Sequence, residues 1–431
     1  MFKRIAVATV ASLVFAVQAF AQDLDAIKPF LSDKTIVVVD VDLAKFDLKA
    51  FEAKAIKAME DAKVGEAQMK QAREEMTANM ARGQKWLDAL KDAKAQRAFV
   101  VVSMPQAGPG GPPMFTVVPT ADDAAATAVG KTIDEAMASG EGEGGPPPTA
   151  THERIGNAVV IGEAPTLAAL KTIKPVDRAD LATAHATATK AGDGAIRVAF
   201  APTGPMRGML MMAADPVVAN VVNAGVQHAG LSVGLPPNES LNLTIQSKDA
   251  KSAEALAKLI NGFMQDLPPG APPEMAMLQP NAAGDTVKLS LDQAAMTKLI
   301  DGVLPSMIRA RNTAFAVKSA SNIRTLLMMT IMYAQTRDGQ YPDTLADLRE
   351  GQQMPQQAFD ELMTNPAQPT MKPGYIYIKP KDAAAAPGGL VIHEAFEGPF
   401  PTDGVNVGFG DGSVRKIGDE AQFNELLKAA K

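Results

Sequence analysis

DDAAATAVGKTIDEAM (Asp122–Met137) and DAKSAEALAKLINGFM (Asp249–Met264) are helix-like segments that align without a gap at a shift of 127 residues. A shift of 128 residues then aligns the strand-like segments GNAVVI (156–161) and GDTVKL (284–289). Ala-rich helices can align by chance, but a match that continues into a flanking strand makes chance a weaker explanation. We therefore expect an internal duplication, with Thr120 or Asp122 as the N-cap of the first helix.

The duplication predicts two tandem α+β repeats, repeat 1 at residues 22–175 and repeat 2 at residues 190–308. Each would have the order β-α-β-β-α-β followed by a helix, which is the split βαβ or ferredoxin-like order. The run KTIVVVDV (34–41) is rich in β-branched residues and predicts a buried strand. The other strands are expected at 97–103, 114–118, 158–162, 195–201, 230–235, 241–247 and 286–291. Helices are expected at 43–92, 122–139, 164–173, 206–227, 249–265 and 293–308.

The first 21 residues have the pattern of a secretory signal peptide. Lys3 and Arg4 form a charged start, residues 5–17 form an apolar run, and Ala19-Phe20-Ala21 supplies the small residues of a cleavage site. The apolar run is short for a membrane span of about 20 residues, so we expect cleavage rather than an uncleaved anchor. The mature chain would be exported, periplasmic or extracellular, and without a later membrane span.

The composition excludes several classes of function. The 431 residues include no Cys, which excludes disulfides, thiolate metal sites and Cys nucleophiles. The net charge of −6 argues against a partner that is nucleic acid, because such binding needs a basic face. The four His (His152, His185, His228 and His393) lack metal-binding spacing, so we expect each on the surface or hydrogen-bonded in the core.

The last third of the chain, residues 309–431, contains all four Tyr and therefore differs from the repeats. A helix is expected at 309–337, where Ile323, Leu326, Leu327, Thr330, Ile331 and Ala334 form an apolar face. Asp338-Gly339 should end it, with Gly339 in a left-handed cap. Strands at 374–379 and 389–393, a hairpin of 405–409 with 413–417, and a helix at 420–430 should follow. Asp411-Gly412 in that hairpin predicts a type I′ turn.

Two motifs in this region resemble a known family. DGQYPDTLADL (338–348) resembles the G-x-[YF]-P-x-[ST]-L passage from stem to head in type II secretion pseudopilins. GVNVGFGDGSV (404–414) resembles the N-V-x-F-x-D-G-[SH]-V hairpin of prepilin-type proteins with an H-x9-D-G domain. The prepilin cleavage motif G-F-T-L-x-E is absent, and Pro401 replaces the family's His. The resemblance therefore implies a pseudopilin-like head, a long helix with a small antiparallel sheet, on an exported chain. The repeats resemble only exported bacterial proteins without an assigned activity.

Oxygen-bearing side chains near the final hairpin are candidate metal ligands. Asp403, Asn406 and Asp411, together with Glu394 and Asp419, could contribute to a calcium site, because calcium takes six to eight oxygen ligands. Major pseudopilins bind calcium in their C-terminal loop. The competing explanation is turn chemistry, since Asp-Gly already suits a hairpin turn and no D-x-D-x-D-G pattern is present. No other cofactor is expected.

The absence of a catalytic motif favours a non-enzymatic, exported cell-envelope protein. It would act by binding or assembly with a protein partner in the envelope. Two alternatives stay open. One is an exported hydrolase or ligand-binding enzyme with a site between the repeats, which requires clustered acidic residues with shifted pKa values. The other is a component of type II secretion or pilus machinery.

Overall fold

The computed structural model describes residues 24–62, 64, 66–104, 113–138, 150–213, 221, 225–266, 272–352, 354–368, 371–380, 388–396, 400–401 and 404–430. The expected signal peptide (1–21) lies outside these residues. The chain divides into two compact units. The first comprises Met1–Ala55 and Met76–Val303, and the second comprises Ile56–Glu75 and Leu304–Lys431.

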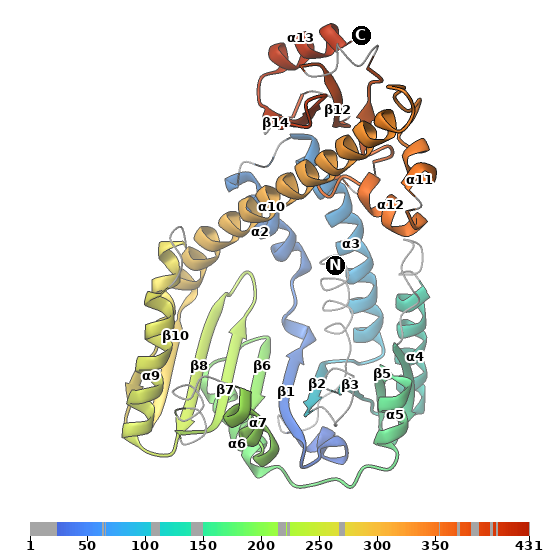
Figure 1. The fold of residues 1–431 in the computed structure, drawn as a ribbon. Coiled ribbons are helices and arrows are strands. Elements are labelled where there is room, and N and C mark those ends of the chain that lie inside the picture. The colour runs from blue at the N-terminus through green and yellow to red at the C-terminus, as the bar shows by residue number, and fades with distance from the viewer. Residues whose placement is uncertain are drawn as a thin grey trace. The chain divides into compact units, whose positions relative to one another are not determined.

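Ten strands of the first unit form one antiparallel sheet (Figure 1). They are β1 (Thr35–Asp42), β2 (Arg97–Ser103), β3 (Met114–Pro119), β4 (Ala150–Ile155), β5 (Ala158–Glu163), β6 (Ile196–Phe200), β7 (Val226–Gly234), β8 (Ser240–Ser247), β9 (Asn281–Ala283) and β10 (Thr286–Leu291). Their order across the sheet is β4-β5-β3-β2-β1-β6-β7-β8-β10-β9. β1 pairs with β6 at the centre of the sheet. The order outward from β1 is β2-β3-β5-β4, and the order outward from β6 is β7-β8-β10-β9, so the two halves have matching strand orders.

This strand order corrects the ferredoxin-like expectation. In a split βαβ unit another strand lies between the two strands that the helix connects. Here β1 pairs directly with β2, and β6 pairs directly with β7. β1 and β2 can pair directly because two successive helices, α2 (Leu48–Asp61) and α3 (Glu66–Asp92), connect them and return the chain in the antiparallel direction. The coarser expectation of a mixed α+β chain is confirmed.

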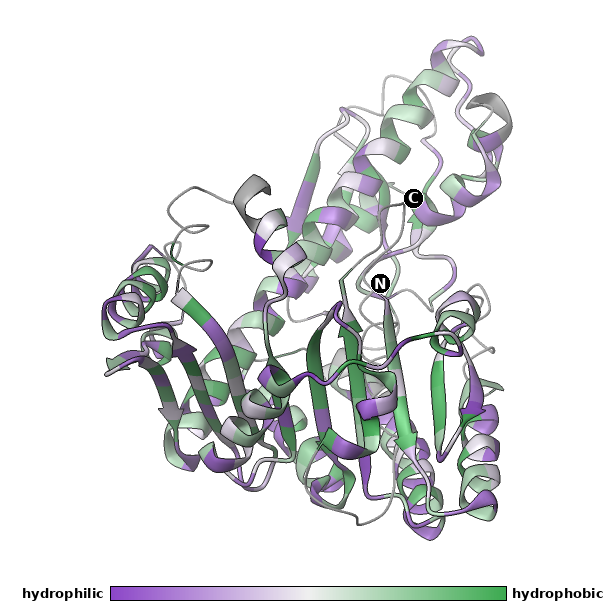
Figure 2. Cartoon of the chain, turned by 90° about the horizontal axis from the view of Figure 1, so that it is seen from below, coloured by the Kyte–Doolittle hydropathy of each residue, from purple (hydrophilic) through white to green (hydrophobic). Residues whose placement is uncertain are grey.

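Buried apolar side chains hold helices on both faces of the sheet. On β1, Val38 faces a cluster that includes Ile27 of the 3₁₀ helix η1 (Leu24–Phe30), and Val41 faces a cluster that includes Leu90 of α3. The alternation follows from the two-residue period of a strand. Figure 2 shows hydrophobic residues concentrated along these central strands. Each such side chain contributes about 1.5–3 kcal/mol when it is fully buried.

Five further helices lie around this sheet in the described part of the first unit. They are α4 (Asp123–Ala138), α5 (Ala164–Leu170), α6 (Ala179–Ala191), α7 (Gly204–Ala213) and α9 (Ala250–Gln265), and short 3₁₀ turns lie at η2 (Leu43–Lys45) and η4 (Pro273–Leu278). Leu167 of α5 and Leu181 of α6 share the cluster of η1, whereas Val129 of α4 belongs to the cluster of α3. On the other half, Leu256 of α9 packs against Val287 of β10.

The two segments that align in the sequence begin and end in matching ways. Asp122 accepts a hydrogen bond from the Ala125 amide at 2.8 Å, which confirms it as an N-cap, and Asp249 accepts one from the Ser252 amide at 2.8 Å. Gly156 (φ +61°) and Gly284 (φ +62°) occupy left-handed turns of the β4–β5 and β9–β10 hairpins. Non-glycine residues rarely adopt that conformation.

The second unit contains a small antiparallel sheet between helices. Its strands are β11 (Tyr375–Tyr377), β12 (Leu390–Glu394), β13 (Val405–Phe409) and β14 (Val414–Ile417), in the order β11-β12-β13-β14. The long helix α10 (Gln293–Gln335) packs Ile323 and Leu327 against one cluster of this sheet, and Phe423 of α13 (Glu420–Ala430) packs against another. Short helices α11 (Asp347–Gln352) and α12 (Gln356–Met363) complete the unit.

The sequence analysis expected separate helices at 293–308 and 309–337, and this boundary is wrong because α10 runs through it without a break. The expected end of the helix is confirmed, and one expected turn is corrected. Gly339 has φ +82° and its amide donates to the Ala334 carbonyl at 2.8 Å, so the left-handed cap is confirmed. In the β13–β14 hairpin only Gly412 has a positive φ, whereas a type I′ turn needs a positive φ at both central residues. Gly412 donates to the Phe409 carbonyl, which makes a three-residue loop with glycine in the left-handed position.

Helix α6 lies directly against β7 at Gly230. A Cβ at this position would lie 2.6 Å from both the Ala184 carbonyl oxygen and the Ala188 amide nitrogen. These atoms belong to helix backbone, which cannot rotate away. We expect Gly230→Ala to lower the free energy of unfolding by about 1–3 kcal/mol, measured by urea denaturation.

Gly208→Ala provides the control, because Gly208 is exposed on helix α7 with no atom within 4 Å of a new Cβ. It should leave stability unchanged or raise it by up to about 1 kcal/mol. Equal losses in the two variants would contradict the close approach of α6 to β7.

Candidate functional site

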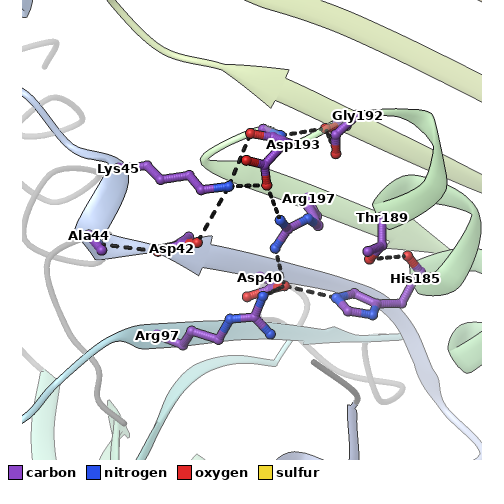
Figure 3. Close-up of polar contacts among 12 residues, drawn as sticks. Asp40, Asp42, Ala44, Lys45, Arg97, His185, Thr189, Gly192, Asp193 and Arg197 are labelled. Carbon is purple, nitrogen blue, oxygen red and sulfur yellow. Dashed lines mark hydrogen bonds and ion pairs between the residues drawn. The ribbon is translucent and has the colours of Figure 1, made fainter. Parts of the chain in front are cut away.

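An acidic residue lies buried at the centre of the large sheet. Asp40 is on β1, is 0 % exposed, and stands directly opposite Arg197 of β6 in the strand register. In Figure 3 the side chains of Arg97, Arg197 and His185 converge on its carboxylate. They come from β2, β6 and α6, so three separate elements supply the groups around one charge.

One oxygen of Asp40 receives all of these contacts. The Nε2 of His185 lies 2.8 Å from Oδ2, the Nη1 of Arg197 lies 3.4 Å away, and the Nη2 of Arg97 lies 3.6 Å away. An ionised carboxylate only accepts hydrogen bonds, so Nε2 of His185 carries the donated proton. Asp40 Oδ1 and Arg197 Nε are buried without a hydrogen-bond partner among the described residues.

Opposing effects set the ionisation of Asp40. Burial by itself raises the pKa of this carboxyl. The hydrogen bond from His185, followed by the positive charges of Arg97 and Arg197, outweighs burial and lowers the pKa below its ordinary value of 3.8. Asp40 is therefore a buried anion at neutral pH.

The network reaches the surface through a second aspartate. Arg197 Nη2 lies 3.4 Å from Oδ1 of Asp193, and Lys45 pairs with the same oxygen. The hydrogen bond that Lys45 donates to Asp193, together with the positive charge of Lys45, lowers the pKa of Asp193. The loop that carries Asp193 is held by Ser232, whose hydroxyl donates to the Gly192 carbonyl at 3.0 Å and accepts from the Gly194 amide at 3.1 Å.

The geometry of this network suits a structural role better than a catalytic one. An acid–base or nucleophilic group must reach a substrate, yet His185 is 2 % exposed and Arg197 is 4 % exposed. Among the described residues, no Ser or Thr hydroxyl is hydrogen-bonded to the imidazole of His185, so the nucleophile of a triad is not in place. The ion pairs instead join β1, β2, β6 and α6.

Within the described residues, the candidate calcium ligands do not form a cluster that could bind the ion. Asp403 lies outside those residues. Asn406 is buried, and its amide nitrogen donates to the Ala316 carbonyl at 3.0 Å and to Glu394 Oε1 at 2.9 Å. Asp411 accepts a hydrogen bond from the Ser413 amide at 2.8 Å, as the turn explanation expects. In the described part of the chain, no three His, Asp or Glu side chains are placed to hold a metal ion.

The sequence did not single out Asp40, Arg97 or Arg197. His185 was expected on the surface or hydrogen-bonded in the core, and the second case is confirmed. Asp40 did carry a usable signal, because it is the one charged residue within the apolar run 35–41. A charge on a strand buried on both faces requires partners. The sequence could not say which residues they are.

The described helices and the comparisons set limits on identification. No described helix has the length and apolar character that a membrane crossing needs. Comparisons with protein-family models, curated proteins and solved structures give no match. The fold and the network therefore define a class only, an α+β chain with a ten-stranded antiparallel sheet and a separate small-sheet unit.

Replacing Asp40 should destabilise the first unit in a pH-dependent way. Asp40→Asn leaves buried cations without their anion, so we expect a loss of about 3 kcal/mol at pH 7. Because the native pKa of Asp40 lies below 3.8, the carboxylate contributes fully above about pH 4, and the contribution is lost as the pH falls through the native pKa. The difference from wild type should therefore shrink at pH 3 in denaturant titrations.

Asp123→Asn serves as the control, because Asp123 pairs with Arg154 at an exposed position. Exposed pairs contribute little, so this variant should unfold almost as wild type does. An Asp40→Asn loss that is the same at pH 3 and pH 7 would show that shape rather than charge matters at Asp40.

Calcium provides a direct test of the hairpin residues. If turn chemistry explains Asp411, the melting temperature of the protein should be the same in EDTA and in millimolar CaCl2. A calcium site would instead raise the melting temperature as the ion concentration exceeds its Kd, and Asp411→Ala would abolish the increase.

Proposed function

We propose that this chain is a non-enzymatic, exported cell-envelope protein that acts by binding a protein partner. The observation that carries the proposal is the burial of Asp40, His185 and Arg197, which pair with one another out of reach of a substrate. The clustered charges that an enzyme would need lie in the first unit, but they are buried and paired with one another. The signal-like first 21 residues support export.

The proposal includes the internal duplication and the pseudopilin-like character of the second unit. A duplication is supported by the matching strand orders on either side of the β1–β6 pair, and by the corresponding N-caps Asp122 and Asp249 of the two aligned helices. A long helix followed by a four-stranded antiparallel sheet supports a pseudopilin-like head. We place partner binding in this head, residues 309–431, because its helix exposes apolar side chains.

Affinity capture from an envelope extract tests this function. The mature full-length chain should retain a saturable set of proteins, identified by quantitative mass spectrometry. A chain without residues 309–431, verified as folded by circular dichroism, should lose them. His185→Gln, studied at a temperature at which it stays folded, should retain the same set, because the buried network does not touch partners.

The enzyme alternative makes the opposite prediction. Turnover of ester, peptide, glycoside or phosphate substrates by the purified chain, abolished by His185→Gln, would overturn the non-enzymatic proposal. Capture that is unchanged after removal of residues 309–431 would overturn the assignment of binding to the head.

A further inference from the structure

Helix α10 has a second, uncharged face that its own unit leaves exposed. The face consists of residues three or four positions apart, which we call the α10 stripe: Met307, Ala310, Ala314, Val317, Ser321, Thr325, Met328 and Met332. All eight are exposed, and Met307 and Val317 are 63 % and 65 % exposed. Ile323, Leu327 and Ala334, which are buried, lie on the opposite side of the helix.

The charge beside the α10 stripe has one sign. From Leu304 to Arg337 the sequence contains five basic residues and no acidic residue. Four of them flank the stripe and are exposed: Arg309, Arg311, Lys318 and Arg324. Arg311 stacks on the Phe315 ring at 4.9 Å, and none of the four forms an ion pair with a described acidic side chain. The uncharged face therefore has basic margins without acidic counterparts of its own.

We propose that the α10 stripe docks an acidic amphipathic helix of a partner protein. Small residues at 310, 314 and 321 allow another helix backbone to approach closely, and the Met and Val side chains supply apolar area. The basic margins match acidic residues that flank the apolar face of such a helix. This inference rests on the proposed function and names the chemistry of the partner.

Two other occupants fit the same face less well. A second copy of α10 would bring basic margins against basic margins, which is repulsive. An anionic bilayer would satisfy the charges, but helices that lie in a membrane interface present bulky Trp, Phe or Leu side chains. The α10 stripe has none of these three residue types, so the observations favour a helix.

A pair of synthetic helices tests the proposal with the mature full-length chain. Both peptides carry Leu at the a and d positions of four heptads, and they differ in having Glu or Lys at the e and g positions. We expect the Glu peptide to bind at least tenfold more tightly than the Lys peptide by fluorescence anisotropy, with affinity that falls as salt rises. The double variant Val317→Glu with Met328→Glu should weaken binding of the Glu peptide at least tenfold.

Two further variants separate docking from misfolding. Asn424→Glu adds an acidic residue at an exposed position of α13 and should leave binding unchanged. Arg311→Glu with Lys318→Glu should reverse the preference, so that the Lys peptide binds more tightly. Each variant should match wild type in its circular dichroism spectrum and melting temperature, so that the reversal reports the charge beside the α10 stripe rather than loss of the fold.

Three results would overturn the proposal. They are equal affinity for the two peptides, stronger association with phosphatidylglycerol vesicles than with the Glu peptide, and a dimer in analytical ultracentrifugation that the Val317→Glu with Met328→Glu variant dissociates. Capture of envelope proteins that survives this double variant would remove the α10 stripe as the docking surface while leaving the proposed function intact.

Discussion

A carboxylate that lies inside a sheet obliges the surrounding chain to bring positive charge to it. Asp40 meets this condition through Arg197 on the neighbouring strand, Arg97 on the other side and His185 on the covering helix. Moving β1 by one residue along β6 would turn Asp40 toward the apolar cluster that contains Leu90. Buried ion pairs often contribute little net stability, but a buried charge that loses its partner is strongly destabilising. We therefore infer that the main effect of these ion pairs is to select the register at the centre of the sheet.

Local features of this chain could be predicted because short segments determine them. The cap at Asp122, the αL residue at Gly339 and the apolar face through Ile323 and Leu327 each depend on a few neighbouring residues. Strand order depends on pairing between distant segments, which no local pattern records. The expected ferredoxin-like order was therefore wrong, although most of the strands themselves were predicted.

Two kinds of information were absent from the sequence patterns. The strand β4 has the sequence ATHERI, whose polar residues suit the edge of a sheet but lack the apolar alternation that predicts a strand. The partners of Asp40 come from positions 97, 185 and 197, which only the folded topology brings together.

The central position of β1 also determines when this protein can fold during its synthesis. Asp40 and Arg197 are 157 residues apart in the chain, so β1 emerges from the ribosome long before β6 exists. At about 5–20 residues per second, roughly 8 to 30 s pass before the partner strand is made. Until then the β-branched run of β1 has β2 on one side and an unpaired edge on the other. This delay keeps the ten-stranded sheet incomplete while the N-terminal half of the chain is already synthesised.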